Sequence, residues 1–120
     1  MSDRELLEMA AKAAGIEGKW AEWDHAYGDY REYGLDYGGR TLWNPITDDG
    51  DALRLAVNLG LLVYVFHDPA MTCIRLPGDR IGGKYDEVEM HGNDQFAATR
   101  RAIVRAAAEI GRQMQEGGAA

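Results

Sequence analysis

The sequence predicts an α+β fold, in which a small antiparallel sheet packs with about three helices as an α/β sandwich, in the order helix, hairpin, helix, strands, helix. Three observations support this fold class. Helical periodicity with capping residues marks residues 3–14 and a second stretch that ends at Gly60. Residues 61–90 are instead rich in β-branched and aromatic side chains. Helical periodicity returns over residues 93–115.

The length of 120 residues fits one domain, residues 1–120, with a frayed tail expected at 117–120. The formal charge of −7 disfavours direct binding to nucleic acid, which depends on many Lys and Arg. Cys73 is the single cysteine, so no internal disulfide can form and a reducing compartment is expected. The longest apolar run, residues 61–66, is too short to cross a membrane. These properties predict a cytoplasmic protein that does not bind membranes.

The first helix is predicted over residues 3–14. Ser2 and Glu5 have the spacing of a capping box, which satisfies free amides at the start of a helix. Apolar residues then recur at helical spacing, and Gly15 stands where helices commonly end in the left-handed conformation. Both ends of this helix are therefore predicted from local residues.

Residues 20–43 hold seven of the eleven aromatic side chains of the chain. They are Trp20, Trp23, Tyr27, Tyr30, Tyr33, Tyr37 and Trp43. Their spacing has a helical rhythm, but the glycines among them would each cost roughly 1 kcal/mol inside a helix. We therefore favour an antiparallel hairpin of residues 19–27 and 30–37, with Gly28–Asp29 as its two-residue loop and residues 40–43 as a further edge.

The second helix is predicted to begin after Thr47 or Asp48, beyond the turn that Asn44–Pro45 favours. Asp48, Asp49 and Asp51 place negative charge near the positive end of the helix dipole. Its apolar residues, which cover much of its circumference, are Leu53, Leu55, Ala56, Val57 and Leu59. We therefore expect this helix to pack on more than one side.

Three strands are predicted next, over residues 61–66, 71–76 and 85–90. The first, LLVYVF, is β-branched and aromatic throughout, so we expect it to be largely buried. The third alternates Glu87 and Glu89 with Val88 and Met90, so we expect one of its faces to be wet.

The last helix is amphipathic. The apolar residues that share one of its faces are Phe96, Ile103, Ala107, Ile110 and Met114. Arg101, Arg105 and Arg112 share the opposite face. Because arginine is well suited to binding phosphate, these three are candidate anion-binding residues. The alternative is a solvated helix face with ion pairs along it.

No pattern predicts a catalytic residue, a metal site or a cofactor. Residues 48–51 resemble part of a calcium loop, but its first and twelfth positions would fall on Pro45 and Ala56, which supply no side-chain ligand. The three histidines are far apart in the sequence, and no zinc spacing joins them to Cys73. A protein without enzymatic activity is therefore expected.

The aromatic segment is the candidate partner-binding surface. Tyr and Trp are enriched at the centres of interfaces, and the acidic neighbours of this segment would form a charged rim. The candidate residues are Trp20, Trp23, Tyr27, Tyr30, Tyr33 and Tyr37. The alternative is that these rings belong to the core.

Three blocks of the sequence, SDRELLEMAAKAAGI, WNPITDDGDALRLAVNLGL and AATRRAIVRAAAEIGRQM, together cover about half of the chain. They resemble small bacteriophage and prophage proteins of the phage ABA-sandwich type. The resemblance implies helices against a small antiparallel sheet. It implies no catalytic residues, because the family has no established activity.

The function predicted from these observations is that of a non-enzymatic bacteriophage accessory protein, which binds a host or phage protein to counter a host antiviral defence. One alternative is sequestration of a small nucleotide signal, by stacking on Trp or Tyr and phosphate contacts from Arg. Another is an acidic mimic of nucleic acid that blocks a DNA-binding enzyme. A homodimer is a further prediction, through an edge strand or the Tyr-rich segment.

Overall fold

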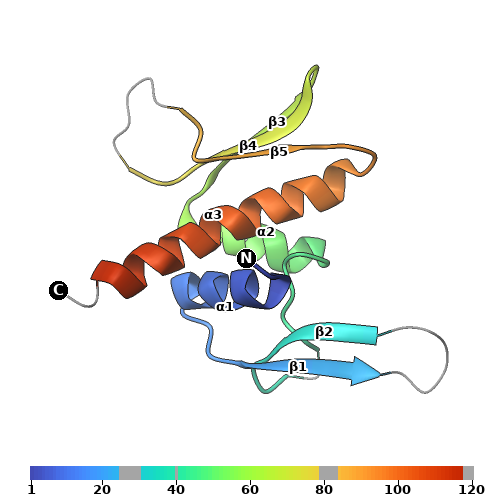
Figure 1. Cartoon of the computed structure of the whole chain (residues 1–120), viewed down its shortest axis with the longest axis vertical. Coiled ribbons are helices and arrows are strands. Elements are labelled where there is room, and N and C mark those ends of the chain that lie inside the picture. Colours follow the sequence, from blue (N-terminus) through green and yellow to red (C-terminus); the bar gives the residue numbers. More distant parts are fainter. Residues whose placement is uncertain (25–30, 40, 79–83, 118–120) are drawn as a thin grey trace.

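Figure 1 shows a computed structural model of the chain, which describes residues 1–24, 31–39, 41–78 and 84–117. Within these residues the helices are α1 (Asp3–Ala14), α2 (Asp49–Leu59) and α3 (Gln95–Gly117). The strands are β1 (Lys19–Asp24), β2 (Arg31–Asp36), β3 (Leu62–His67), β4 (Ala70–Arg75) and β5 (Glu87–Met90). The predicted α+β class and the order of its elements are confirmed.

The strands form two separate antiparallel sheets. β1 pairs with β2, while β3, β4 and β5 form a three-stranded sheet with β4 in its centre. In Figure 1 the helices lie between the hairpin on one side and the three-stranded sheet on the other. The long helix α3 contacts α1, α2, β4 and β5, so it holds the layers together. Among the described residues, no helix has the length and apolar character needed to cross a membrane.

The ends of α1 and α2 are formed by the predicted caps. The Ser2 hydroxyl accepts a hydrogen bond from an amide in the first turn of α1, and Gly15 ends that helix with a φ of 72°. The Asp48 carboxylate accepts from the amide of Asp51 at 2.8 Å, and Gly60 ends α2 with a φ of 65°. Side chains other than glycine are strained in this left-handed region, which explains why both helices stop at glycine.

The core between α1 and α3 is built largely from small side chains. Its buried alanines are Ala10, Ala11, Ala102, Ala106, Ala107 and Ala108. Gly111 adds a position on α3 with no side chain at all, directly against the backbone of Met9 on α1. The two helices therefore approach each other closely, and larger side chains such as Leu6 and Leu7 fill the space beside them.

The predicted hairpin is confirmed as the pair β1–β2, with a different register. Asp24 lies opposite Arg31, and the two side chains form an ion pair of 2.8 Å. Regular pairing from a two-residue loop at Gly28–Asp29 would instead place Tyr33 opposite Asp24, so the predicted register is wrong by two residues. The loop, residues 25–30, lies outside the described residues.

The predicted further edge beside the hairpin is present as a single bridge between Leu35 and Trp43. The amide of each residue donates to the carbonyl of the other, at 3.0 and 2.9 Å. The neighbouring Gly34 makes this approach possible, because a β-carbon there would lie 2.6 Å from the carbonyl oxygen of Trp43. The bridge fixes Trp43 in the core, where it is buried.

The three-stranded sheet turns an unexpected face of β5 toward α3. Glu89 forms an ion pair of 3.5 Å with Arg105 of α3, so the carboxylates of this strand point to the helix. Val88 and Met90, which alternate with the carboxylates, are 48% and 63% exposed. One face of β5 is therefore exposed to solvent, as predicted, but the exposed face is the apolar one.

Candidate functional site

Helix α2 buries only one of its sides. Ala52, Leu55 and Ala56 are buried against the rest of the protein, whereas Leu53 and Val57 are 65% and 70% exposed. The expectation that α2 packs on more than one side is therefore wrong for the single chain. Its second apolar side faces solvent.

Strand β3 is exposed on both of its faces. Val63 and Val65, on one face, are 36% and 47% exposed, and Leu62 and Tyr64, on the other, are 48% and 38% exposed. The expectation of a largely buried strand is therefore wrong. The reason is position, because β3 is the edge strand of its sheet and α3 packs against β4 and β5.

The exposed sides of α2 and β3 line the same groove. Leu53 of α2 forms one wall, Val63 and Val65 of β3 form the other, and Phe96 and Ile103 of α3 lie between them. The groove has a volume of about 450 Å³, which is within the range of sites that bind ligands or peptide side chains. Phe96 is 63% exposed, so a large ring is available at the surface of this groove.

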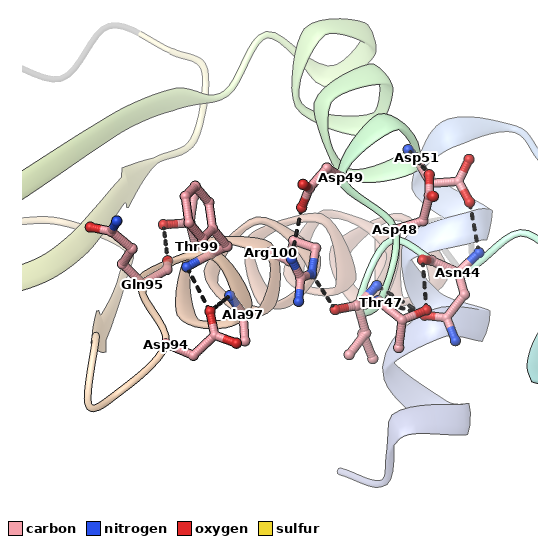
Figure 2. A network of polar contacts seen from close by, with 12 residues as sticks. Asn44, Thr47, Asp48, Asp49, Asp51, Asp94, Gln95, Ala97, Thr99 and Arg100 are labelled. Carbon is pink, nitrogen blue, oxygen red and sulfur yellow. Dashed lines mark hydrogen bonds and ion pairs between the residues drawn. The ribbon is translucent and has the colours of Figure 1, made fainter. Parts of the chain in front are cut away.

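Polar residues also line the groove, and Figure 2 shows two of them, Asp49 and Arg100. The Arg100 guanidinium on α3 forms an ion pair of 2.7 Å with Asp49 on α2, and it donates a second hydrogen bond of 2.7 Å to the carbonyl of Ile46. Arg100 therefore ties α3 to the start of α2. Since two of its nitrogens already bond to the protein, its role here is to hold the groove's two helices together.

The polar network continues to Asn44, which joins the hairpin to α2 (Figure 2). Its side-chain amide donates to the carbonyl of Tyr33 at 2.8 Å, and its side-chain oxygen accepts from the amide of Ile46 at 3.0 Å. Its backbone amide donates to the carboxylate of Asp51 at 3.0 Å. Asn44 is buried, and its bond to the amide of Ile46 is shielded from water, while the other two are partly buried.

Between the three-stranded sheet and α3, a chain of hydrogen bonds connects Gln95, Thr99, Thr72 and His91. The Thr99 hydroxyl donates to the carbonyl of Gln95 at 2.8 Å, so it can only accept from Thr72, which lies 2.7 Å away. The single hydroxyl proton of Thr72 is then used, and the Nε2 atom of His91 at 2.8 Å must donate to it. This order of donors predicts a proton on Nε2 of His91.

Of the predicted aromatic surface, Trp20 and Tyr33 lie on the described part of the hairpin as a ring pair. Their centroids are 5.8 Å apart, and the Arg4 guanidinium of α1 lies 5.7 Å from the Trp20 ring. Trp20 also packs against the edge of the core. This pair therefore has a structural role in holding the hairpin against α1.

The remaining predicted aromatic residues are partly or largely exposed, or they lie outside the described residues. Trp23 is half-buried on β1, and Tyr37 is 49% exposed just after β2. Tyr27 and Tyr30 belong to the segment 25–30, which the structure does not describe. The contact surface predicted on the hairpin is thus available at Trp23 and Tyr37, and partner binding there stays a prediction.

The three candidate anion-binding arginines are each paired with carboxylates. The partners are Asp3 for Arg101 at 3.3 Å, Glu89 for Arg105 at 3.5 Å, and Glu109 and Glu116 for Arg112. These carboxylates belong to three elements, α1, β5 and α3. The hydrogen bond from Arg112 also lowers the pKa of the Glu109 carboxyl. Anion binding and nucleotide sequestration therefore stay predictions, without a preformed cluster of open guanidinium groups to support them.

Cys73 lies in the centre of the three-stranded sheet and is buried. Burial raises the pKa of its thiol, which lowers the fraction of reactive thiolate at neutral pH. Within the described ranges, no three side chains of His, Cys, Asp or Glu come together as a metal ion would require.

Comparison with protein-family models, with curated proteins and with solved structures finds no match to this chain. The similarity to bacteriophage proteins of the ABA-sandwich type therefore stays a prediction from the three sequence blocks.

The groove was not predicted as a site, although the sequence contains a signal for it. The signal is the apolar character of α2 and β3 on more sides than one chain buries, at groove residues such as Leu53 and Val65. A sequence pattern indicates that a side chain should be shielded from water. It does not indicate whether the same chain or another molecule provides the shield.

Proposed function

We propose that this protein is a non-enzymatic accessory protein that binds an apolar segment of another protein in the groove between α2, α3 and β3. One observation carries the proposal. The two elements whose sequences indicate burial on two sides, α2 and β3, face each other across an open groove with Leu53 and Val65 exposed. Contiguous exposed apolar surface of this kind is typical of protein-interaction sites.

The chemistry of the groove defines the segment that fits it. Its walls present branched and aromatic side chains, so the bound segment supplies apolar side chains in turn. Asp49 and Arg100 also line the groove, which favours a polar or charged residue in the part of the segment that meets them. The hairpin supplies a second contact at Trp23 and Tyr37, consistent with the enrichment of Trp and Tyr at interfaces.

The source of the partner follows from the sequence resemblance. Because the three sequence blocks resemble bacteriophage proteins, we propose a host or phage protein as the partner, and interference with a host antiviral defence as the purpose. The proposal of a binding function rests on the groove.

The test is capture of partners from a host-cell lysate by matched variants. Leu53→Lys places a charge in the groove at a side chain that is already exposed, so the fold should persist while capture is lost. Asn58→Lys makes the same kind of change on the same helix, at an exposed residue that does not line the groove, and should capture normally. Equal capture by both variants would remove the support for the groove as the binding site.

A second pair of variants separates the groove from the hairpin. Trp23→Ala with Tyr37→Ala removes one half-buried and one exposed ring of the hairpin region and leaves the groove intact. Loss of capture in this double variant alone would assign binding to the aromatic segment, as predicted from the sequence. Partial loss in both the hairpin and the groove variants would show that one partner spans the two surfaces.

A further inference from the structure

The backbone of β3 directs polar groups out of the open edge of the sheet. In β4 the carbonyls of Ala70 and Ile74 accept hydrogen bonds from the β5 side. Because backbone groups alternate sides along a strand, those of Met71 and Cys73 bond to β3, and Tyr64 lies opposite Cys73. The N–H and C=O groups of Val63 and Val65 are therefore directed away from β4, to the open edge.

The two edges of this sheet are protected very differently. β5 is short, and its Glu87 and Glu89 point inward, a device that prevents a further strand from pairing. The run from Leu62 to Phe66 in β3 has no charged residue, no proline and no glycine. Natural sheets usually block an exposed edge with such residues. An unprotected β3 beside a protected β5 indicates that β3 pairs with another strand.

We infer that β3 pairs in antiparallel orientation with β3 of a second copy of this chain, so that two sheets join into one continuous sheet. The run Leu-Val-Tyr-Val-Phe is nearly symmetric about Tyr64. With Tyr64 on the two-fold axis, Val63 lies opposite the partner's Val65, and Leu62 lies opposite the partner's Phe66. The valines would exchange about four backbone hydrogen bonds across the axis.

Charge and shape favour a second copy over an unrelated strand. Each chain carries a formal charge of −7, so two copies associate well only through a surface without charge, and the run from Leu62 to Phe66 is such a surface. A strand that pairs with β3 must also be apolar on both faces to match it, and β3 itself meets that requirement. Among the described strands, β1 and β2 carry charged residues and β5 is blocked by its carboxylates.

Sedimentation equilibrium of the purified protein tests the inference. The chain has a mass of 13.3 kDa, so the dimer should have twice that mass, 26.6 kDa. Val65→Pro removes an amide that the monomer does not use, and edge strands tolerate proline at such positions. This variant should sediment as a folded monomer, while Val65→Thr, which keeps the amide, should remain a dimer. A wild-type protein that sediments as a monomer at about 100 μM would overturn the inference.

Disulfide trapping provides a second readout, which does not depend on how Val65→Pro folds. Across an antiparallel pair without hydrogen bonds the α-carbons are about 4.5 Å apart, a distance that a disulfide spans. Cys73 lies opposite both Tyr64 and Val88 in the sheet, so it is first replaced by alanine to prevent an intrachain disulfide. In this Cys73→Ala background, Tyr64→Cys should form a disulfide-linked dimer under mild oxidation. Val88→Cys in the same background, exposed on β5 and away from the axis, should not. Equal cross-linking of both variants would show random collision and would contradict the register.

Hydrogen exchange identifies the strand that pairs. The amides of Val63 and Val65 should be protected from exchange in the purified protein, and the protection should fall on dilution. Protection that appears only when another protein is added would assign the edge to that protein instead. These measurements use the purified protein alone, so a monomer that still captures a partner through the groove would overturn this inference and leave the proposed function intact.

Discussion

Gly111 of α3 lies so close to Met9 of α1 that a β-carbon at residue 111 would be 2.0 Å from the Met9 carbonyl oxygen. No side-chain rotation relieves this contact, because the obstructing atoms belong to the backbone of α1. Glycine costs about 1 kcal/mol relative to alanine inside a helix, and here it is the residue that allows α1 and α3 to pack.

We predict that Gly111→Ala destabilises the protein by about 2–3 kcal/mol, since α1 and α3 must move apart and lose contacts around them. Chemical denaturation followed by circular dichroism measures the change. Gly117→Ala is the matched control, because a β-carbon there meets no atom within 4 Å. Equal stability of the two variants would contradict the close contact between Gly111 of α3 and the backbone of Met9 on α1.

We predict that Asn44→Ala destabilises the protein by about 2–3 kcal/mol, because it leaves the carbonyl of Tyr33 and the amide of Ile46 without their partner in a buried region. Asn58→Ala, at an exposed position of α2, should change stability by less than about 0.5 kcal/mol. Thermal unfolding of the two variants side by side provides the measurement. A similar loss in both would mean that Asn44 does not hold the hairpin to α2.

We predict that His91 is protonated on Nε2, because the hydroxyl protons of Thr99 and Thr72 are both committed to other acceptors. Long-range ¹H–¹⁵N correlation spectra distinguish the two nitrogens directly. Thr72→Val should cost about 1–3 kcal/mol, since it leaves the His91 donor unsatisfied, while Thr72→Ser keeps the hydroxyl and most of the stability. An unprotonated Nε2 would contradict the proposed direction of the hydrogen bonds from His91 to Thr72 and from Thr72 to Thr99.

We predict that Glu87→Gln stabilises the protein at neutral pH. Burial raises the pKa of the Glu87 carboxyl in the folded state, which means that folding opposes its ionised form. The wild type therefore loses stability as the pH rises from the unfolded pKa, near 4.3, through the raised folded pKa.

Melting temperatures measured from pH 3 to pH 8 test the Glu87 prediction. The Glu87→Gln variant should melt higher than the wild type at pH 7, and the difference should vanish at the acid end, where both side chains are neutral. Glu89→Gln serves as the comparison, because it removes the ion pair with Arg105 and should not raise the melting temperature. A Glu87→Gln variant that is less stable at pH 7 would reverse the expected sign.

The parts of the fold that depend on nearby residues could be predicted from the sequence. Ser2, Gly15 and Gly60 set the ends of their helices through contacts within one turn, so their roles follow from spacing alone. Contacts between distant residues could not be predicted in this way. Nothing near Gly111 in the sequence indicates that Met9, about one hundred residues earlier, lies against it.

The candidate site was less predictable than the fold. The alternation of Glu89 with Val88 shows that β5 has two different faces, but the choice of face depends on Arg105 of α3, which neutralises the inward carboxylate. For β3, the apolar run correctly indicates a need for shielding, and only the order of strands shows that Val65 stands at an open edge.

The inward carboxylates of β5 limit how far the sheet can grow. If β3 pairs with its copy, both open edges are used, and each end of the joined sheet is then a β5 strand with Glu87 and Glu89 set against further addition. Assembly would then stop at two chains, because the contact is symmetric and closes on itself. An exposed apolar edge strand can nucleate amyloid fibrils in other proteins. Here the same strand would be covered in a closed dimer, which cannot add further chains.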